Sequence, residues 1–170
     1  WIDYVSFGGM TNSTGHDGGY KDYTSKVANI STGSTNQLLV SAGFRSSSYT
    51  EHWAIWIDYN KDGTFSDSEK VASGSSSSAN NLSYNVSVPA NAALGQTRMR
   101  VSMKWNAAQT ACETFSYGEV EDYTVNITSS AVKSVEVAAE ELGNNSGLDL
   151  MAYPSPATDF IQVSLASGVQ

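Results

Sequence analysis

The sequence predicts an all-β fold, an antiparallel β-sandwich of the jelly-roll or immunoglobulin-like type. Two observations lead to this fold class. Short runs of alternating apolar and polar residues recur along the chain, and each run is bounded by clusters of Gly, Asn, Ser or Pro. No segment has a convincing helical pattern, and several short strands without helices are typical of two packed sheets.

The clearest strand is Leu82–Val88, where every second residue is apolar until Pro89 ends the run. One face of this strand is therefore buried and the other lies in water. Two serine-rich stretches, residues 45–49 and 73–78, are too polar to pack, so we expect surface loops there. The predicted strands are, in order, Ile2–Phe7, Gln37–Phe44, His52–Tyr59, Leu82–Val88, Arg98–Trp105 and Glu121–Ile127.

Length and composition exclude several classes of protein. At 170 residues and 18.1 kDa the chain fits one domain with a short appendage, and 40% hydrophobic residues supply one core. A net charge of -8 with nine basic residues excludes the basic face that duplex nucleic acid requires. The longest apolar runs are far shorter than the roughly 20 residues that cross a bilayer, so we expect no membrane span.

The composition changes after Ile127, and this change sets the predicted organisation. We expect a β-sandwich over residues 1–130, a linker over 131–150 and a separate segment over 151–170. Because no Met or leader precedes Trp1, the chain is expected to be a piece of a longer protein. Cys112 is the one cysteine, which excludes an internal disulfide, and we expect it to be a small buried side chain.

Residues 58–69 satisfy the calcium-loop pattern D-x-[DN]-x-[DN]-G-x5-E at every specified position. Ca²⁺ takes about six to eight oxygen ligands, and alternate positions of a tightly curled loop direct their oxygens to one point. Gly63 permits the sharp turn in the middle of the loop. The expected ligands are the side chains of Asp58, Asn60, Asp62 and Glu69, and the main-chain carbonyl of Thr64.

The residues before this loop are β-branched and aromatic, so a strand rather than a helix should lead into it. Without an exit helix to fix Glu69, Asp67 is an alternative last ligand. The metal is expected to make the loop rigid rather than to catalyse a reaction. The alternative is an Asp- and Asn-rich turn that binds nothing.

Three basic residues fall on one face of the predicted strand 98–105, and we name them the basic stripe: Arg98, Arg100 and Lys104. Guanidinium groups pair well with planar anions, so the basic stripe predicts binding of a carboxylated or sulfated polysaccharide. The opposite face, assigned to the core, carries Met99, Val101, Met103 and Trp105.

Two further interpretations of the basic stripe and the aromatic residues near it remain open. The arginines of the basic stripe could instead neutralise nearby carboxylates, such as Glu119, Glu121 or Asp122. Aromatic residues could supply a platform on which a sugar stacks, although each is also a candidate for the core: Tyr49, Trp105 and Tyr117.

The sequence offers no recognisable catalytic constellation. It contains no G-x-S-x-G, no H-E-x-x-H and no phosphate-binding glycine-rich loop. Glu119 and Glu121 are two residues apart on a strand and share a face, which favours hydrogen bonding or a second cation over acid–base catalysis. We therefore expect that the chain is not an enzyme.

Four segments, in this order and spacing, resemble the GEVED domain over about residues 1–128: Gly19–Thr24, Trp56–Gly63, Arg98–Val101 and Tyr117–Val125. The resemblance implies a β-sandwich accessory domain of secreted bacterial multidomain proteins, often proteases or glycan-degrading enzymes, without catalytic activity of its own. The family often has a cysteine near Cys112 together with a partner. This chain has no partner for it, so such a disulfide is absent.

Residues 151–163 are similar to the opening of the C-terminal sorting domain that the type IX secretion system of Bacteroidetes uses. That opening usually reads Tyr-Pro-Asn-Pro, and here Ser155 replaces the Asn. The alternative is a proline-punctuated linker followed by one strand.

Together these features predict a non-catalytic, calcium-stabilised accessory domain of a secreted multidomain enzyme, attached to an extracellular hydrolase or lyase. Its expected role is that of a carbohydrate-binding module for an anionic polysaccharide, at the cell surface or outside the cell. The competing hypothesis is a structural spacer or adhesin-like domain that docks beside a secreted protease or another catalytic domain.

Overall fold

The structure is a computed structural model that describes residues 1–130. The predicted linker 131–150 and the sorting-like segment 151–170 lie outside the described residues. Within residues 1–130 there is no helix long and apolar enough to span a lipid bilayer. The elements are β1 (Ile2–Phe7), β2 (Met10–Ser13), β3 (Tyr20–Ser31), β4 (Thr35–Ala42), β5 (Glu51–Ile57), the 3₁₀ helix η1 (Asp67–Glu69), β6 (Lys70–Ser76), β7 (Leu82–Ser87), β8 (Gly95–Trp105) and β9 (Gly118–Thr128).

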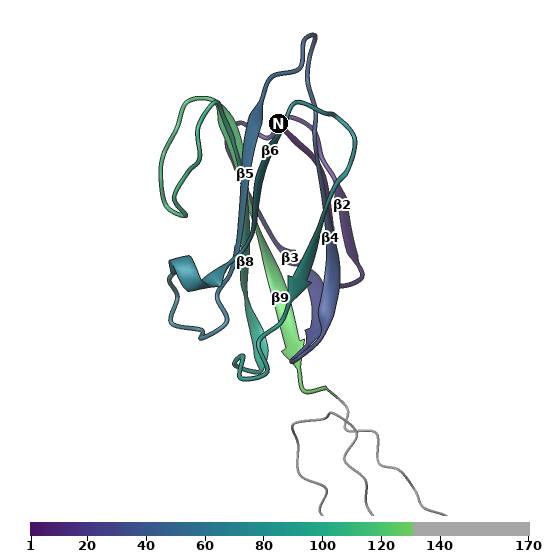
Figure 1. The fold of residues 1–170 in the computed structure, drawn as a ribbon, viewed down its shortest axis with the longest axis vertical. Coiled ribbons are helices and arrows are strands. Elements are labelled where there is room, and N and C mark those ends of the chain that lie inside the picture. Colours follow the sequence, from purple (N-terminus) through teal and green to yellow (C-terminus); the bar gives the residue numbers. More distant parts are fainter. Residues whose placement is uncertain (131–170) are drawn as a thin grey trace, which may run out of the picture. The chain divides into compact units, whose positions relative to one another are not determined.

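The strands form two sheets that face each other, as Figure 1 shows. One sheet has four strands in the order β2-β1-β4-β7, and the other has five in the order β3-β9-β8-β5-β6. Their inner faces supply alternate residues to one core, in which β5 contributes Trp53, Ile55 and Ile57. The predicted all-β sandwich is confirmed.

One pairing corrects the prediction of a wholly antiparallel fold. β3 runs parallel to β9, from Tyr20 opposite Val120 to Ser31 opposite Thr128, so the five-stranded sheet is mixed. These strands are distant in sequence and no hairpin joins them, so no turn fixes their relative direction. The other strand pairs of both sheets are antiparallel.

β6 corrects a second prediction, because it contains residues 73–76 of a stretch that was expected to be a loop. This strand pairs only with β5 and lies at the sheet edge, where serine side chains can face water. A Cβ at Gly74 would lie 2.8 Å from the Tyr84 hydroxyl, so glycine lets the neighbouring sheet approach. Residues 45–49 do form a loop, as predicted.

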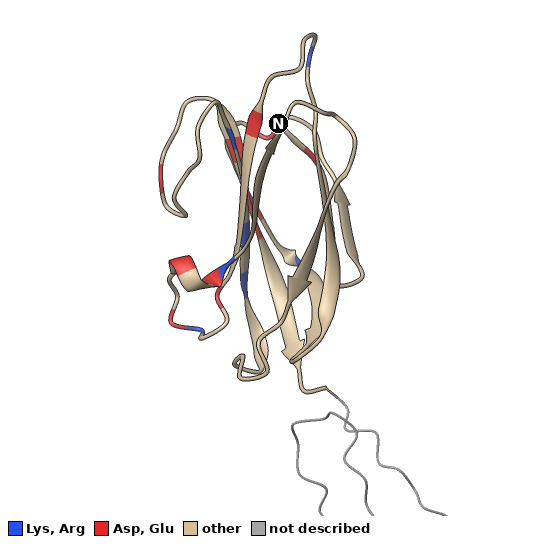
Figure 2. Cartoon of the chain, in the orientation of Figure 1, with Lys and Arg blue, Asp and Glu red and all other residues tan. Residues whose placement is uncertain are grey.

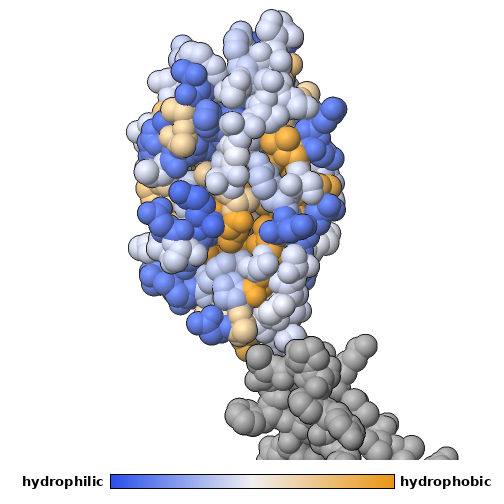
Figure 3. Space-filling view, in the orientation of Figure 1, coloured by the Kyte–Doolittle hydropathy of each residue, from blue (hydrophilic) through white to orange (hydrophobic). Residues whose placement is uncertain are grey.

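Apolar side chains also line the edge between β6 and β7. Val71, Leu82 and Tyr84 are half-buried and pack against the core. Figure 3 shows apolar surface in the middle of the face that it draws.

Cys112, which was predicted to be buried, is exposed in the loop 106–117 between β8 and β9. That prediction was wrong because Cys112 lies on a long loop and not on a core strand.

Candidate functional site

The basic stripe lies on the outer face of β8, as the alternation predicted, but most of its charge is already paired. Arg100 donates two hydrogen bonds to Asp122 on β9, from Nε to Oδ1 at 2.8 Å and from Nη2 to Oδ2 at 2.7 Å. These bonds raise the pKa of the Arg100 guanidinium, whose side chain is 18% exposed. The pairing with a neighbouring carboxylate, left open by the sequence, is what the structure shows.

The other two members of the basic stripe differ in how free they are. Lys104 forms an ion pair with Glu113 of the loop 106–117. Arg98 keeps a 51% exposed side chain, and its Nη1 lies 3.6 Å from Asp122 Oδ2. Figure 2 shows acidic and basic positions on these elements. Arg98 is therefore the member most available to a ligand.

Arg98 and Arg100 border a groove of about 560 Å³ between the loops 58–69 and 106–117. Phe65 also lines it, with its ring centre 5.3 Å from the Arg100 guanidinium carbon. A cation against an aromatic face is a favourable contact, and here it holds the loop 58–69 against β8. The groove thus has a structural explanation without a ligand.

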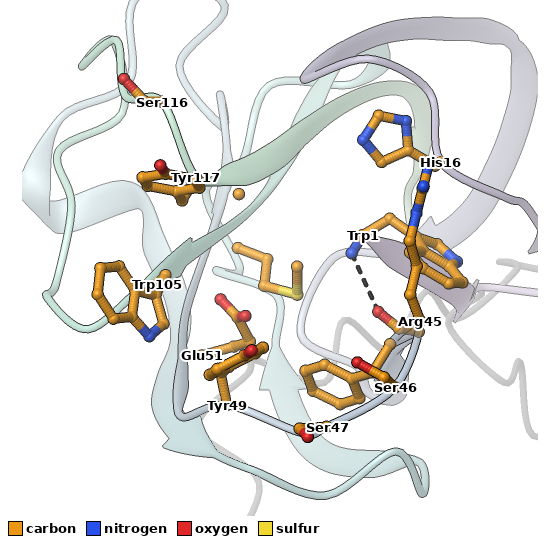
Figure 4. Close-up of a pocket in the computed structure, with 14 residues that line it drawn as sticks. Trp1, His16, Arg45, Ser46, Ser47, Tyr49, Glu51, Trp105, Ser116 and Tyr117 are labelled. Atoms are coloured by element: carbon orange, nitrogen blue, oxygen red, sulfur yellow. Dashed lines mark hydrogen bonds between the residues drawn. The ribbon is translucent and has the colours of Figure 1, made fainter.

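A second pocket, of about 590 Å³, lies where the two inner faces meet at one end of the sandwich (Figure 4). It brings together all three aromatic residues that the sequence singled out, and we name it the aromatic pocket. Trp105 and Tyr117 stand almost perpendicular, at 81°, with ring centres 5.8 Å apart. Tyr49 and Tyr117 are more than half exposed. Its lining includes Trp1, Phe44, Tyr49, Glu51, Trp105 and Tyr117.

Trp105 corrects the assignment of one whole strand face to the core. Met99, Val101 and Met103 are buried as expected, whereas Trp105 is 44% exposed. It belongs to the same inward-facing row but ends it, and at the end of β8 its ring lines the aromatic pocket. The period of two predicted the face correctly and did not predict where the core stops.

Two glycines let the walls of the aromatic pocket come close together. A Cβ at Gly43 would lie 2.2 Å from Cε2 of the Trp1 ring. Gly118 has φ of +140°, and a Cβ there would lie 2.2 Å from the carbonyl oxygen of Met103. Neither position accepts a side chain without moving its neighbour, so the pocket wall depends on glycine at both.

Glu51 is a pocket residue that the sequence reasoning missed. It begins β5, opposite Trp105 in the ladder, and is 7% exposed. Burial raises the pKa of its carboxyl group. The sequence did indicate it, because Glu51 continues the inward-facing row of Trp53, Ile55 and Ile57. Burial of a carboxyl group in such a row costs free energy, so an acidic residue there is a candidate functional residue.

The loop that follows β5 brings three of the predicted calcium ligands together. The main-chain N–H of Asp62 donates to Asp58 Oδ1 at 3.2 Å and to Asn60 Oδ1 at 2.9 Å. The Gly63 N–H donates to Asp58 Oδ2 at 3.1 Å, and Gly63 has φ of +82°, so it makes the predicted turn. Thr64 donates to Asp62 Oδ1 through both its N–H and its hydroxyl.

Glu69 is buried and directed to the backbone of this loop. Its Oε1 accepts from the N–H groups of Tyr59 and Asn60, at 3.0 and 3.3 Å. Its Oε2 accepts from the N–H and the hydroxyl of Ser66, at 2.9 and 2.8 Å. Asp67, the alternative ligand, lies on η1 and pairs with Lys70. Within the described part of the chain, no three His, Cys, Asp or Glu side chains cluster closely enough to hold a metal.

Glu119 and Glu121 face the interior and serve hydrogen bonding, one of the two roles that the sequence left open. Glu119 accepts from the main-chain N–H groups of Ile2 and Asp17, each at 2.7 Å. Glu121 accepts from the Tyr123 hydroxyl at 2.7 Å, and burial raises the pKa of Glu121 to about 7. These carboxyl groups fasten the beginning of the domain to β9.

Two packed sheets that carry structured loops and a pocket at one end define a β-sandwich domain. Residues 52–126 match the GEVED domain, which confirms the resemblance over β5 to β9. The chain thus carries a GEVED domain, a non-catalytic accessory domain. No curated protein matches the chain.

Proposed function

We propose that this domain binds a polysaccharide in the aromatic pocket, on behalf of a catalytic domain in the same secreted protein. The observation that carries the proposal is that Tyr49, Trp105 and Tyr117 line one pocket with walls set by close glycine contacts. Sugar rings present apolar C–H faces, and aromatic side chains with one wet edge are suited to stack on them. The pocket combines aromatic rings with polar side chains such as Arg45, Ser46 and Glu51, and ligand sites use both kinds of group.

Exposed aromatic side chains support a binding role, because apolar side chains that are exposed next to one another commonly mark an interaction site. Within residues 1–130, five large hydrophobic side chains are exposed, and three of them line the aromatic pocket. The other two are Tyr20 and Leu94. Scattered exposure of this kind is ordinary, whereas three aromatic rings around one pocket are a candidate site.

Binding of an anionic polysaccharide on the outer face remains a prediction. It rests on the basic stripe, in which Arg100 and Lys104 already have carboxylate partners. Arg98 is left as its principal contact for a carboxylate or sulfate group. For this reason we place the main site in the aromatic pocket.

We also propose that the loop 58–69 binds one Ca²⁺, which makes it rigid. The hard oxygen donors are the side chains of Asp58, Asn60 and Asp62, with the carbonyl of Thr64. Asp58 Oδ1 and Asn60 Oδ1 both accept from the Asp62 N–H, and Asn60 Nδ2 donates to Asp62 Oδ2 at 2.8 Å, so the three side chains lie close together. Glu69 would have to give up backbone donors in order to reach the ion.

The test of polysaccharide binding is retention on immobilised neutral, amino and acidic polysaccharides. Trp105→Ala should lower affinity by about tenfold or more, because a central tryptophan commonly carries much of the binding energy. Leu94→Ala removes an exposed apolar side chain outside the pocket and is the control. Equal retention of both variants and the wild type would rule out the aromatic pocket as the site.

The arms of this experiment also separate the alternatives. Retention that Arg98→Ala abolishes and Trp105→Ala spares, and that weakens as salt rises, would place the site on the basic stripe. If the wild type binds no polysaccharide, the spacer or adhesin-like role becomes the better account of the domain.

A further inference from the structure

Glu51 lies in the aromatic pocket without the partners that a buried carboxyl group normally has. Its Oε2 is enclosed, and within residues 1–130 it accepts no hydrogen bond. No Lys, Arg or His of the described residues forms an ion pair with Glu51. The other buried acidic residues described above have donors at both oxygens, as in Glu69, Glu119 and Asp122.

A buried carboxyl group without donors destabilises the folded protein, because water's hydrogen bonds to it are lost and nothing replaces them. Such a group persists in a pocket when a ligand supplies the missing donors. Glu51 fits this description since it lines the pocket beside the exposed rings. Figure 4 shows it beside Tyr49 and near Trp105, two rings on which a sugar could stack.

The basic groups at the rim of the pocket do not fill this role. Arg45 and His16 line the same pocket. Figure 4 shows both beside Trp1, on the wall away from Glu51. The charge of the Trp1 amino group partly offsets the effect of burial on the pKa of Glu51, but this group donates to the Gly43 carbonyl oxygen, at 3.1 Å, and not to Glu51. The part of the pocket around Trp105 therefore combines aromatic faces with an acceptor oxygen that receives no hydrogen bond.

We propose that Glu51 determines the specificity of the aromatic pocket, selecting a sugar that offers it hydrogen-bond donors and carries no acidic group there. The donors are hydroxyl groups of a neutral sugar or the ammonium of an amino sugar. This inference rests on the proposed function. A uronic acid or sulfated sugar would bring a second anion against Glu51 in a poorly hydrated site, which is unfavourable.

The test uses the 170-residue chain, Glu51→Gln and titration calorimetry with neutral, amino, N-acetylamino and acidic oligosaccharides. Wild type should bind its preferred neutral or amino sugar at least about tenfold more tightly than any acidic one. Glu51→Gln should lose about tenfold in that affinity, since hydrogen bonds to a charged acceptor are the stronger ones. Asp22→Asn makes the same charge change on an exposed strand residue and should bind like wild type.

A second measurement separates selection of the ligand from support of the fold. Glu51→Gln should melt at the same temperature as wild type or higher, because it removes a buried charge that has no partner. A residue with a purely structural role would give a lower melting temperature instead. Weaker binding together with unchanged or raised stability is the expected signature.

The possible failures are distinguishable. If Trp105→Ala loses binding and Glu51→Gln does not, the pocket binds sugar and the role of Glu51 is wrong. If wild type prefers an acidic sugar and Trp105→Ala abolishes that binding, the inference about Glu51 is overturned and the pocket stands. If wild type binds none of the sugars, both the proposed function and this inference are wrong.

Discussion

At the scale of single residues, the hydrogen bonds around Glu121 accommodate a protonated carboxyl group, which its raised pKa favours below about pH 7 in the folded domain. Thr14 has one hydroxyl hydrogen, yet its Oγ1 lies 2.8 Å from the Ile2 carbonyl oxygen and 3.1 Å from Glu121 Oε1. If Thr14 donates to Ile2, a proton on Glu121 completes the second bond. Tyr123 donates to the other carboxyl oxygen. Burial, which raises the pKa of Glu121 to about 7, favours the same protonated form.

This neutral carboxyl group predicts a loss of stability as pH rises. The pKa of Glu121 is about 7 in the folded domain and 4.5 as the ordinary value, so its contribution is fully present below pH 4.5. As pH rises through 7, the folded state must either bury a charge or unfold. The free energy of unfolding should fall by on the order of 3 kcal/mol across that window, measured by denaturant melts at several pH values.

Glu121→Gln isolates this effect. Its amide oxygen can accept from Tyr123 and its amide N–H can donate to Thr14, so it reproduces the bonds of the neutral acid. The variant should match wild type near pH 4 and be more stable near pH 8. Glu51 has a raised pKa as well and acts in the same direction, so some slope remains in the variant. A slope identical to that of wild type would contradict the assignment.

At the scale of elements, the loop 58–69 is stabilised by the proposed Ca²⁺ and by the hydrogen bonds of Glu69, and the two contributions can be measured separately. The calcium proposal predicts that chelator lowers the melting temperature, because a ligand at a hundredfold excess over its Kd adds about 2.7 kcal/mol. Asp62→Asn should remove most of this difference, since it takes one charged donor from the site. Asp22→Asn, with the same charge change outside the loop, should keep it.

The hydrogen bonds that Glu69 accepts from the loop backbone stabilise the loop without the ion. Gln at this position can offer an oxygen to only one of its two sets of donors, so Glu69→Gln should cost about 1–3 kcal/mol even in chelator. If its destabilisation disappears when calcium is removed, Glu69 acts as a metal ligand and not as a backbone cap. Thermal melts with and without chelator distinguish the two roles.

Strands whose two faces differ were the predictable elements. β7 was predicted from its first residue to within one residue of its end, because apolar and polar residues alternate from Leu82 until Pro89 ends the run. β3 was missed, since the first half of this strand is largely exposed and has no apolar face to reveal it. Its parallel pairing with β9 arises from contacts distant in sequence, which no local pattern encodes.

The sites were predictable in part for a similar reason. Alternation placed Arg98, Arg100 and Lys104 on one face, but their carboxylate partners come from β9 and the loop 106–117. Aromatic composition identified Trp105 as a candidate for stacking. It could not show that Glu51 lies opposite, because that depends on the register between β5 and β8.

At the scale of the whole molecule, net charge favours the aromatic pocket over the basic stripe as the place where a glycan binds. Residues 1–130 contain twelve Asp and Glu and eight Lys and Arg, so the described domain is itself acidic and disfavours the approach of a polyanion. A neutral or cationic sugar meets no such barrier. The whole-molecule field and the partner-free carboxyl of Glu51 thus select the same class of ligand.

The organisation of the chain leads to the last prediction, that residues 1–130 fold without the rest. The core residues described here lie between Ile2 and Ile127, and β9 ends at Thr128. The Ser130 N–H still donates to the Thr32 hydroxyl, at 3.2 Å, so the cut belongs after Ser130 and not before it. The shortened chain should be soluble and melt in one cooperative transition within about 2–4 °C of the full chain, which corresponds to under about 1 kcal/mol for a domain of this size. Calorimetry of both chains measures this, and a broad or much lower transition in the shorter one would show that residues 131–170 contribute to the folded domain.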